Sequence, residues 1–507
     1  MKMVKKTIPA LLALLMIIPM IVACGNTGNS DTTTPVADTV DSAAPGTDEG
    51  TKSTVDENGY LLDDIPAGLK YNEEINIFYW TDYTMTEFFV EDSTGDNISN
   101  AIYSRNLNVE DRLGVTLSYY GEKGGSDSMN AWIQKAETDW KGSHEFDIYA
   151  GYSRSAPQLA YRGYNVNLLT TEHFDVEKPW WPEALMNECT FGNKLYFCSG
   201  DISTNMLWMM IGTFYNKSMY EARMPAGTKT PEQMVDDKEW TMDVMFNMTK
   251  DIYEDTDGDT AVSAGDTYGF VIYETNIDAF QTAAGIVSIE KAIDGTLSLS
   301  SDWLGERCAT LCKTVGDYLK SPGVYHKNST SIRTIFNEER ALFITDRCFI
   351  VAGKDNASSK DRIEFEYGII PQPMMNADQG FYLTNMGHPY TMYAVSSNSS
   401  AVEASATVIE CMGSLNYRSV TPQVFESAMK LRYATGGDAA RMYDILRGTV
   451  SFDLGRIMAS NFGNTTANAF RTTALSSPDS YASKLKAYKS SLEGNLKTFV
   501  GTIEGLE

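Results

Sequence analysis

The order of strands and helices is clearest around the stretch FDIYAGYSRSAPQLAYRG, residues 146–163. Its first six residues, FDIYAG (146–151), combine aromatic and β-branched side chains and predict a strand. Two similar runs precede it, INIFYW (75–80) and VTLSYY (115–120), and each is followed by a helical pattern. Because alternating strands and helices favour parallel pairing with helices on the sheet faces, we expect an α/β fold.

The same alternation continues through the chain. Ile98, Ile102, Val109 and Leu113 recur near the helical period, and Gly114 can end that helix in a left-handed cap. Further helical stripes lie within residues 241–252, 304–319 and 481–496. Further strand-like runs are LYFC (195–198), LWMMIGTFY (207–215), YGFVIY (268–273), ALFIT (341–345), FEYGII (365–370) and TMYAV (391–395).

The first residues predict export from the cytoplasm. Lys2, Lys5 and Lys6 precede an apolar run over residues 8–22, which is shorter than the about 20 residues of a membrane-spanning helix. IVAC (21–24) resembles the lipobox of bacterial lipoproteins, which implies cleavage before Cys24 and a lipid on its thiol. An ordinary secretory signal followed by a chance cysteine is the alternative.

The segment after Cys24 is too polar to form a core. Residues 25–58 are mostly Ser, Thr, Asp, Gly and Pro, so burial cannot offset their conformational entropy. We therefore assign residues 1–23 to a lipoprotein signal peptide and 24–70 to a lipid-anchored flexible tether. The body would then sit on the outer face of the cell membrane, held there only by the lipid.

Composition limits the classes of partner. The 507 residues carry a formal charge of −26, which argues against binding to the phosphate backbone of nucleic acid and fits a soluble monomer. A body of this length predicts two domains. The six cysteines after Cys24 show no zinc spacing and are expected to be mostly buried thiols, although Cys189 and Cys198 could pair across the turn at 192–193.

Four segments together resemble the carbohydrate-type, family 1 solute-binding lipoproteins of ATP-driven (ABC) importers. They are EFDIYAGYSRSAPQLAYRGYNVNLL (145–169), GNKLYFCSGDISTNMLWMMIGTFYNKSMYE (192–221), FNEERALFITDR (336–347) and FEYGIIPQP (365–373). The resemblance spans residues 70–500 and implies a periplasmic-binding-protein-like fold of two lobes with a hinge. We place an N-terminal lobe at 71–203 with 390–450, and a C-terminal lobe at 204–389 with 451–507.

The resemblance implies capture of a solute, expected to be a sugar or oligosaccharide, for delivery to the permease subunits of an ABC importer. Sugar sites need aromatic platforms and polar side chains, which gather at the carboxyl ends of strands. That rule and the family's layout give these candidates: Trp80, Asp82, Tyr152, Ser153, Arg154, Glu274, Asp346 and Arg347 after strands, and Asp201, Trp208 and His388 at lobe crossings. Core packing of the two tryptophans, an Asp346–Arg347 ion pair and a structural His388 are the alternatives.

A second pattern is DTDGDTAVSAGD (255–266), whose spacing suits the oxygen ligands of Ca²⁺. Asp255, Asp257, Asp259 and Asp266 would supply carboxylates, Ala261 a backbone carbonyl and Ser263 a ninth-position ligand. Thr260 stands where such loops carry a turn glycine. The alternatives are a structural calcium ion and a solvated acidic turn; we expect no other cofactor.

The chain is expected to be a binder rather than an enzyme. A cell-surface glycoside hydrolase would need two carboxylates facing each other across a sugar, and no stretch singles out such a pair. A ligand sensor that reports to a membrane kinase is a further alternative. Peptides and other solutes also stay open as ligands.

Overall fold

The computed structural model describes residues 54–82, 87–92, 95–352, 363–434 and 436–506. The predicted signal peptide, Cys24 and most of the predicted tether lie outside these residues, so the lipid anchor stays a prediction. Residues 54–507 cluster as one unit. Of the helices in the described residues, none is long and apolar enough to cross a membrane.

The first sheet has the strand order β13-β3-β1-β2, and with its helices it forms what we call the first lobe. The strands are β1 (Glu73–Trp80), β2 (Val115–Glu122), β3 (Ile148–Tyr152) and β13 (Thr391–Val395). β1 pairs in parallel with β2 and β3, as the sequence predicts, and β13 closes the edge antiparallel to β3. The helices of this lobe are α1 (Asn97–Leu113), α2 (Met129–Lys141), α3 (Ala156–Tyr161), α4 (Glu183–Cys189) and α13 (Val402–Leu415).

Local sequence explains these elements. Gly114 ends α1 with φ 62° and ψ 38°, the left-handed cap that the pattern predicts. On the sheet, Phe78 stacks between Trp132 of α2 and Phe146, with ring centroids 4.6 Å apart in both pairs. Ile98, Ile102, Val109 and Leu113 are buried on one face of α1. These aromatic and aliphatic contacts hold the helices on the sheet through apolar burial.

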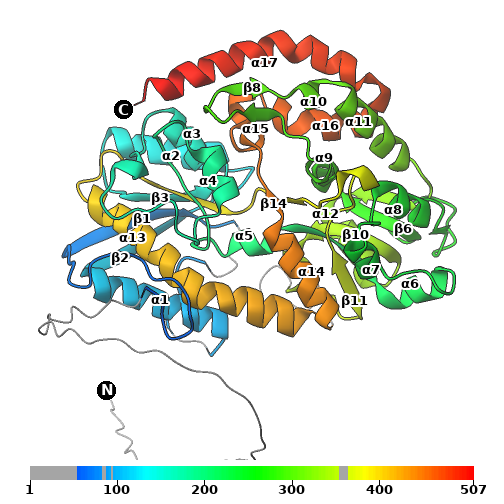
Figure 1. Ribbon diagram of the computed structural model, residues 1–507, viewed down its shortest axis with the longest axis horizontal. Helices are drawn as coiled ribbons and strands as arrows, with labels where there is room; N and C mark the ends of the chain where they lie inside the picture. The colour runs from blue at the N-terminus through cyan, green and yellow to red at the C-terminus, as the bar shows by residue number, and fades with distance from the viewer. Residues whose placement is uncertain (1–53, 83–86, 93–94, 353–362, 435, 507) are drawn as a thin grey trace, which may run out of the picture. The chain divides into compact units, whose positions relative to one another are not determined.

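The second sheet, with its helices, forms the second lobe. Its order is β11-β4-β10-β6-β5, with β9 also paired to β6. The strands are β4 (Ile211–Asn216), β5 (Tyr253–Glu254), β6 (Thr267–Tyr273), β9 (Val324–Lys327), β10 (Ala341–Arg347) and β11 (Tyr367–Ile370). β10 runs parallel to β6 and antiparallel to β4. Figure 1 shows the two sheets on either side of β14 (Val450–Ser451), which pairs with β12 (Thr384–Asn385).

Most remaining elements surround the second sheet. They are α6 (Lys217–Arg223), α7 (Pro231–Asp236), α8 (Met242–Thr249), α9 (Asp278–Ala283), β7 (Ile289–Lys291), β8 (Leu297–Leu299), α10 (Ser301–Leu304), α11 (Glu306–Tyr318) and α12 (Ser329–Asn337). α13 continues in π-helical turns over Asn416–Val420 and Pro422–Tyr433 before α14 (Gly437–Gly448). α14 packs against β11 of the second sheet, whereas the predicted boundary at residue 450 grouped it with the first lobe.

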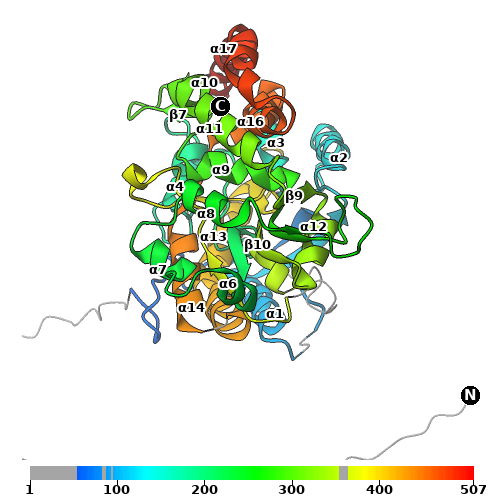
Figure 2. The same cartoon turned by 90° about the vertical axis from the view of Figure 1, so that its right-hand side faces the viewer.

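The C-terminal segment packs mainly on the second lobe. It comprises α15 (Leu454–Ile457), α16 (Thr465–Ser476) and α17 (Tyr481–Glu504), and Figure 2 shows α16 and α17 beside α11. The end of α17 also reaches the first lobe, where Phe499 stacks on Tyr161 of α3 with centroids 5.8 Å apart. This segment therefore touches both lobes.

The N-terminal part of the described chain is attached to the first lobe. Asp63 is buried and accepts hydrogen bonds from Arg112 of α1, at 2.8 Å from its Nη1, and from the Ser414 hydroxyl of α13 at 2.6 Å. Ile65 is buried as well. The predicted tether, residues 24–70, therefore extends too far at its C-terminal end. The polar composition of this segment predicts a solvated chain, but Asp63 is bound by side chains of the first lobe.

Two other local predictions are wrong. In LWMMIGTFY the strand begins only at Ile211, because residues 205–208 form the short helix α5 (Asn205–Trp208). LYFC forms no strand and contributes a single bridge, from Cys198 to Tyr393. Of the cysteines in the described residues, all six are buried and free, so Cys189 and Cys198 do not pair.

Candidate functional site

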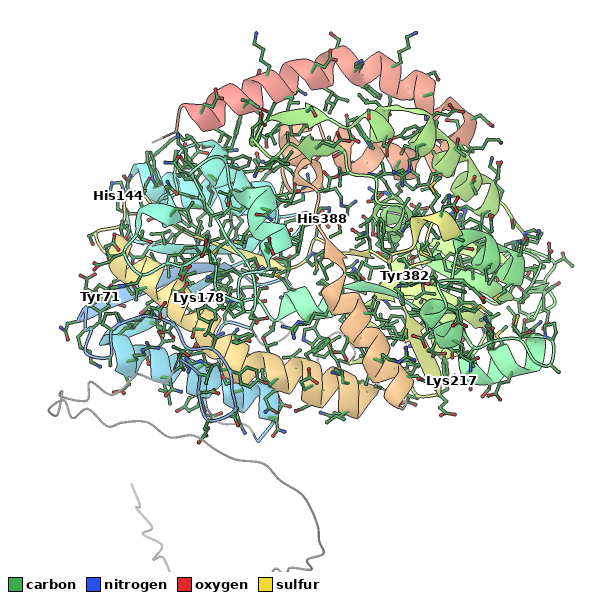
Figure 3. The ribbon with its side chains drawn as sticks, in the orientation of Figure 1. Tyr71, His144, Lys178, Lys217, Tyr382 and His388 are labelled. Atoms are coloured by element: carbon green, nitrogen blue, oxygen red, sulfur yellow. The ribbon has the colours of Figure 1, made fainter. Side chains whose placement is uncertain are left out.

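The two lobes meet where the chain crosses between the sheets. Met210 bridges Met386 in an antiparallel pair, and the Gly387 N–H donates to the Met209 carbonyl at 2.9 Å. His388 follows directly and is labelled at this junction in Figure 3, between the two sheets. The Ser153 hydroxyl, just after β3, donates to the His388 carbonyl at 2.6 Å. The junction therefore joins β3 of the first lobe to the crossing segment.

Two cavities lie at this junction and share Met386 and Phe452 in their walls. The first, which we call the His388 cavity, holds about 70 Å³. Its polar lining residues include Thr282, Asn385, His388, Tyr390, Ser451, Asp453 and Arg456. The second, the Asp201 cavity, holds about 270 Å³ and is lined by Asp201, Arg447, Glu183 and several apolar side chains such as Met206 and Leu207. Both are smaller than the 300–1,000 Å³ typical of ligand pockets.

Positive charge surrounds the His388 cavity. The pKa of His388 lies well below its ordinary value because of loss of solvent and the nearby guanidinium groups of Arg456, Arg154, Arg471 and Arg347. Arg456 Nη2 lies 3.5 Å from His388 Nε2. Arg456 and Arg471 both contact one carboxylate oxygen of Asp278, Arg456 at 3.1 Å. A neutral imidazole among cations is therefore the state that this arrangement favours.

Part of the predicted site is brought together here. Tyr152, Ser153, Arg347 and His388 all lie at the junction, and the rings of Tyr152 and His388 are 6.4 Å apart. Arg154, from the same predicted loop, reaches across the junction to the Ser460 hydroxyl at 3.2 Å. These residues lie near the carboxyl ends of β3 and β10, where the strand-end rule places ligand groups.

Other predicted residues have structural contacts. Trp80 is fully buried and its indole N–H donates to the Thr391 hydroxyl at 2.8 Å, as a core residue would. Trp208 is buried against Tyr433, with ring centroids 6.4 Å apart. The Asp82 carboxylate accepts the Gly124 and Gly125 N–H groups at 2.6 and 2.8 Å. These three side chains therefore have structural partners within the protein.

The remaining three predicted residues differ in position. Glu274 is exposed. Asp346 is fully buried, its carboxylate binds Arg333 Nε at 2.6 Å and accepts the Arg347 N–H at 2.8 Å, and the charges of both arginines act on it. Asp201 forms a 3.2 Å ion pair with Arg447 in the wall of the Asp201 cavity, and burial raises its pKa to about 6.

Several junction residues escaped the sequence interpretation. They come from five places in the chain: Arg456 on α15, Arg471 on α16, Asp278 on α9, Asn385 on β12, and Asp453 directly before α15. Asp453 accepts hydrogen bonds from the Ser288 N–H at 2.9 Å and the Gly455 N–H at 2.8 Å. No short motif marks these residues, because helices and loops far apart in the sequence bring them together.

The acidic loop keeps three carboxylates close together. One carboxylate oxygen from each of Asp255, Asp257 and Asp259 lies within 4.8 Å of the others, and all three residues are exposed. Thr260 adopts φ 64°, the left-handed conformation that this loop position requires even without glycine. Asp266 is instead buried and accepts the Ser263 N–H at 2.9 Å. Ala261 is exposed and Ser263 is half-buried in the same turn. The loop could hold a cation through the three carboxylates alone.

Direct contacts close the junction on its C-terminal side. The Gln158 amide donates to the Asn461 side chain at 2.7 Å. The Tyr161 hydroxyl accepts a hydrogen bond from Thr502 at 3.2 Å, beside the Tyr161–Phe499 stack. The Leu454 N–H donates to Glu188 of α4 at 3.0 Å. These contacts run from the first lobe to the segment that packs on the second lobe.

No protein-family profile and no curated protein sequence matches this chain. Solved structures do match. UgpB from Mycobacterium tuberculosis, in complex with glycerophosphocholine, gives a TM-score of 0.53 at 14% identity, covering 83% of this chain and 98% of its own. A family 1 extracellular solute-binding protein from Bifidobacterium longum subsp. infantis gives 0.52 at 12%, covering 84% and 100%. The cyclic α-maltosyl-1,6-maltose binding protein from Arthrobacter globiformis gives 0.53 at 14%, covering 84% and 99%. The chain therefore has the two-lobe α/β fold of extracellular solute-binding proteins.

Proposed function

We propose that the protein is an extracellular binding lipoprotein that captures a solute between its lobes and delivers it to the permease of an ABC importer. The observation that carries this proposal is the pair of cavities at the crossing between two lobes of a solute-binding fold. A carbohydrate is the proposed ligand class. Among the similar structures, the ligands named include a cyclic maltosyl-maltose and glycerophosphocholine, so the fold alone does not select the solute.

Binding in this proposal requires the lobes to open and close. The His388 cavity of about 70 Å³ is too small for an oligosaccharide. In this proposal the arrangement is a closed one without ligand, and the lobes close less far around a bound sugar. A ligand that contacts both lobes only when they are closed would shift the population towards that state. The contacts of Gln158, Tyr161 and Glu188 with the C-terminal segment are among those that opening would break.

The cavity walls favour binding over hydrolysis. Of the described residues, Asp453 is the one acid in the wall of the His388 cavity, and both its oxygens already accept hydrogen bonds from Ser288. A glycoside hydrolase needs one carboxyl group as acid and a second as base or nucleophile. The wall of the Asp201 cavity carries two acids, Asp201 and Glu183, and Asp201 is paired with Arg447, which leaves Asp201 poorly suited to either role.

The proposal is tested with the chain from residue 24, carrying Cys24→Ser to prevent lipidation. Thermal unfolding is measured against a panel of neutral and acidic mono- and oligosaccharides, and the mixtures are then analysed for products. A ligand at about 100 times its Kd should stabilise the fold by about 2.7 kcal/mol. A melt shift without product supports the binder, release of shorter sugars supports a hydrolase, and a flat panel refutes a carbohydrate ligand. Co-purification with a permease or with a membrane kinase separates transport from sensing.

A further inference from the structure

Positive charge gathers at the lobe junction of a chain whose formal charge is −26. Four guanidinium groups act on His388, and they come from four separate places in the fold: Arg154 after β3, Arg347 at the end of β10, Arg456 on α15 and Arg471 on α16. Burying like charges together is costly, and an arginine side chain does not lose its proton to escape that cost. The junction therefore needs negative charge from some source.

The protein supplies only part of that negative charge. Arg456 and Arg471 share one carboxylate, Asp278, whose side chain is 5% exposed. Asp346 is held by Arg333, and Asp453 accepts hydrogen bonds from Ser288. Asp278 lies against Arg456 and Arg471, Asp346 interacts with Arg347 as well as Arg333, and Asp453 is already engaged by neutral donors. Arg154 is the one of the four guanidinium groups for which no carboxylate partner is found among the described residues.

Arg154 is the clearest uncompensated cation. Its Nη2 donates to the Ser460 hydroxyl at 3.2 Å and to the Asn464 side-chain oxygen, which are both neutral. Its Nε is buried and has no hydrogen-bond partner. Within the described part of the chain, no carboxylate forms an ion pair with Arg154. Burial and the charges of Arg456 and Arg471 lower the pKa of Arg154, which reflects the same lack of a counter-ion.

A neutral donor in the wall of the His388 cavity also lacks a partner. Asn385 is 2% exposed and lines the His388 cavity together with Arg456. Its side-chain oxygen accepts the Thr282 hydroxyl at 3.2 Å, but its Nδ2 has no acceptor. A buried amide donor without a partner costs free energy, which an acceptor entering the cavity would recover. The junction therefore contains a neutral donor without an acceptor, Asn385 in the cavity wall, and a cation without a carboxylate partner, Arg154 beside Ser460.

We propose that the lobe junction binds the acidic group of an anionic solute, a carboxylate or phosphate carried by the captured sugar, with Arg154, Arg456 and Asn385 as donors. Guanidinium groups match the planar oxygens of these groups and form hydrogen bonds about twice as strong as neutral ones. This inference rests on the proposed function and names its substrate class. The acidic solute replaces the counter-ion that the protein lacks.

The test compares acidic and neutral sugars on the chain from residue 24 with Cys24→Ser. The acidic probes are galacturonate, glucuronate, trigalacturonate and glucose 6-phosphate, and the neutral ones are galactose, glucose and maltotriose, all by isothermal titration calorimetry. We expect at least one acidic probe to bind 10-fold or more tightly than its neutral counterpart, and to weaken as NaCl is raised. The uronates and the sugar phosphate distinguish a carboxylate from a phosphate.

The matched variants are Arg154→Gln and Arg441→Gln. Arg154→Gln should weaken the acidic probe about 10-fold or more, since it removes a hydrogen bond between charged groups, and should raise the Tm of the ligand-free protein. Arg441 is a surface residue paired with Asp236 and Asp438, so Arg441→Gln should change neither binding nor the preference for acid. A purely structural Arg154 would instead lower the ligand-free Tm on replacement.

The outcomes separate this inference from the proposed function. If neutral sugars bind and their acidic counterparts do not, the inference is overturned while the binder stands. If no sugar binds, the carbohydrate ligand is refuted, and inorganic phosphate becomes the deciding probe. A phosphate-induced melt shift that Arg154→Gln abolishes would still support an oxyanion site, and the absence of any shift would refute it.

Discussion

Replacing Phe499 by alanine is expected to loosen the closed arrangement of the lobes. α17 packs along α11, α16 and β8 of the second lobe. Its residue Phe499 nevertheless contacts two aromatic rings of the first lobe, both from the part of the chain that connects β3 to α5. It stacks on Tyr161 with an interplanar angle of 5° and meets Phe191 edge-on at 5.7 Å. Phe499 is only 1% exposed, so these contacts exclude water. Opening the lobes would separate Phe499 from both rings.

The size of the effect follows from these two ring pairs. Each pair contributes about 0.5–1.5 kcal/mol beyond area burial, so about 1–3 kcal/mol of closed-state stabilisation is lost. That corresponds to a shift of about 5- to 150-fold towards the open state. If the ligand-free protein is mostly open, the affinity for any ligand that requires closure falls by the same factor.

The assay needs no knowledge of the ligand. Spin labels at exposed Leu107 on α1 and at Lys313 on α11 report the distance between the lobes by pulsed electron paramagnetic resonance. We expect Phe499→Ala to broaden this distribution and move it to longer distances without ligand. Calorimetry with a binding solute then gives the loss of affinity.

Phe470→Ala is the matched control. Phe470 is buried on α16, which packs on α11 within the second lobe, so its loss should cost fold stability of about 3–5 kcal/mol without opening the junction. Equal interlobe distances and equal affinities in the two variants would contradict the proposed role of Phe499 in holding the two lobes together.

Three further predictions concern the fold, pH and calcium. Asp63→Asn should cost about 2–4 kcal/mol of unfolding free energy at pH 7 in urea titrations, whereas Asp64→Asn, an 82% exposed neighbour, should stay within about 0.5 kcal/mol. Burial alone would raise the pKa of Asp63, but hydrogen bonds from Arg112 and Ser414 outweigh burial and lower this pKa. The loss of unfolding free energy in Asp63→Asn should therefore vanish as pH falls through the lowered pKa of Asp63. A loss that stays constant with pH would argue against the ion pair. Burial raises the pKa of Glu410 to about 8, so the folded protein keeps this proton and its unfolding free energy falls as pH rises from the ordinary carboxyl range to 8. Glu410→Gln should therefore be more stable than the parent protein by about 1 kcal/mol or more at pH 8 and equally stable at pH 5. A gain at both pH values would contradict this cause. Calcium should raise the Tm relative to a chelator, and Asp257→Asn should abolish the difference; identical melts of the parent protein would leave the loop a solvated turn.

Much of the fold was predictable because its signals are local. The three parallel strands of the first sheet and the left-handed Gly114 follow from short-range pattern and backbone sterics. The prediction of one strand over LWMMIGTFY was wrong because a continuous apolar run does not distinguish a buried helix from a buried strand. The buried Asp63 was missed since its partners, Arg112 and Ser414, are 49 and 351 positions away.

The junction was predictable only from strand ends. Tyr152 and Arg347 end strands and Ser153 follows one, so a topological rule predicts their place at the junction; their role in binding stays a prediction. Trp80 also ends a strand, but its side chain points towards Thr391 in the core. The register of the strand determines to which face a side chain points, and amino-acid composition does not show that register. The arginines on α15 and α16 depend on how the C-terminal segment folds back, and no local pattern encodes that return.

The attachment of Asp63 to α1 and α13 has a mechanical consequence. Tension along the chain before residue 54 is transmitted to the first lobe at Arg112 and Ser414, far in sequence from every strand of the second sheet. In a protein anchored through residues 24–53, as the sequence predicts, a pull on the anchor would load the first lobe only. The second lobe would then move without displacing the anchored segment.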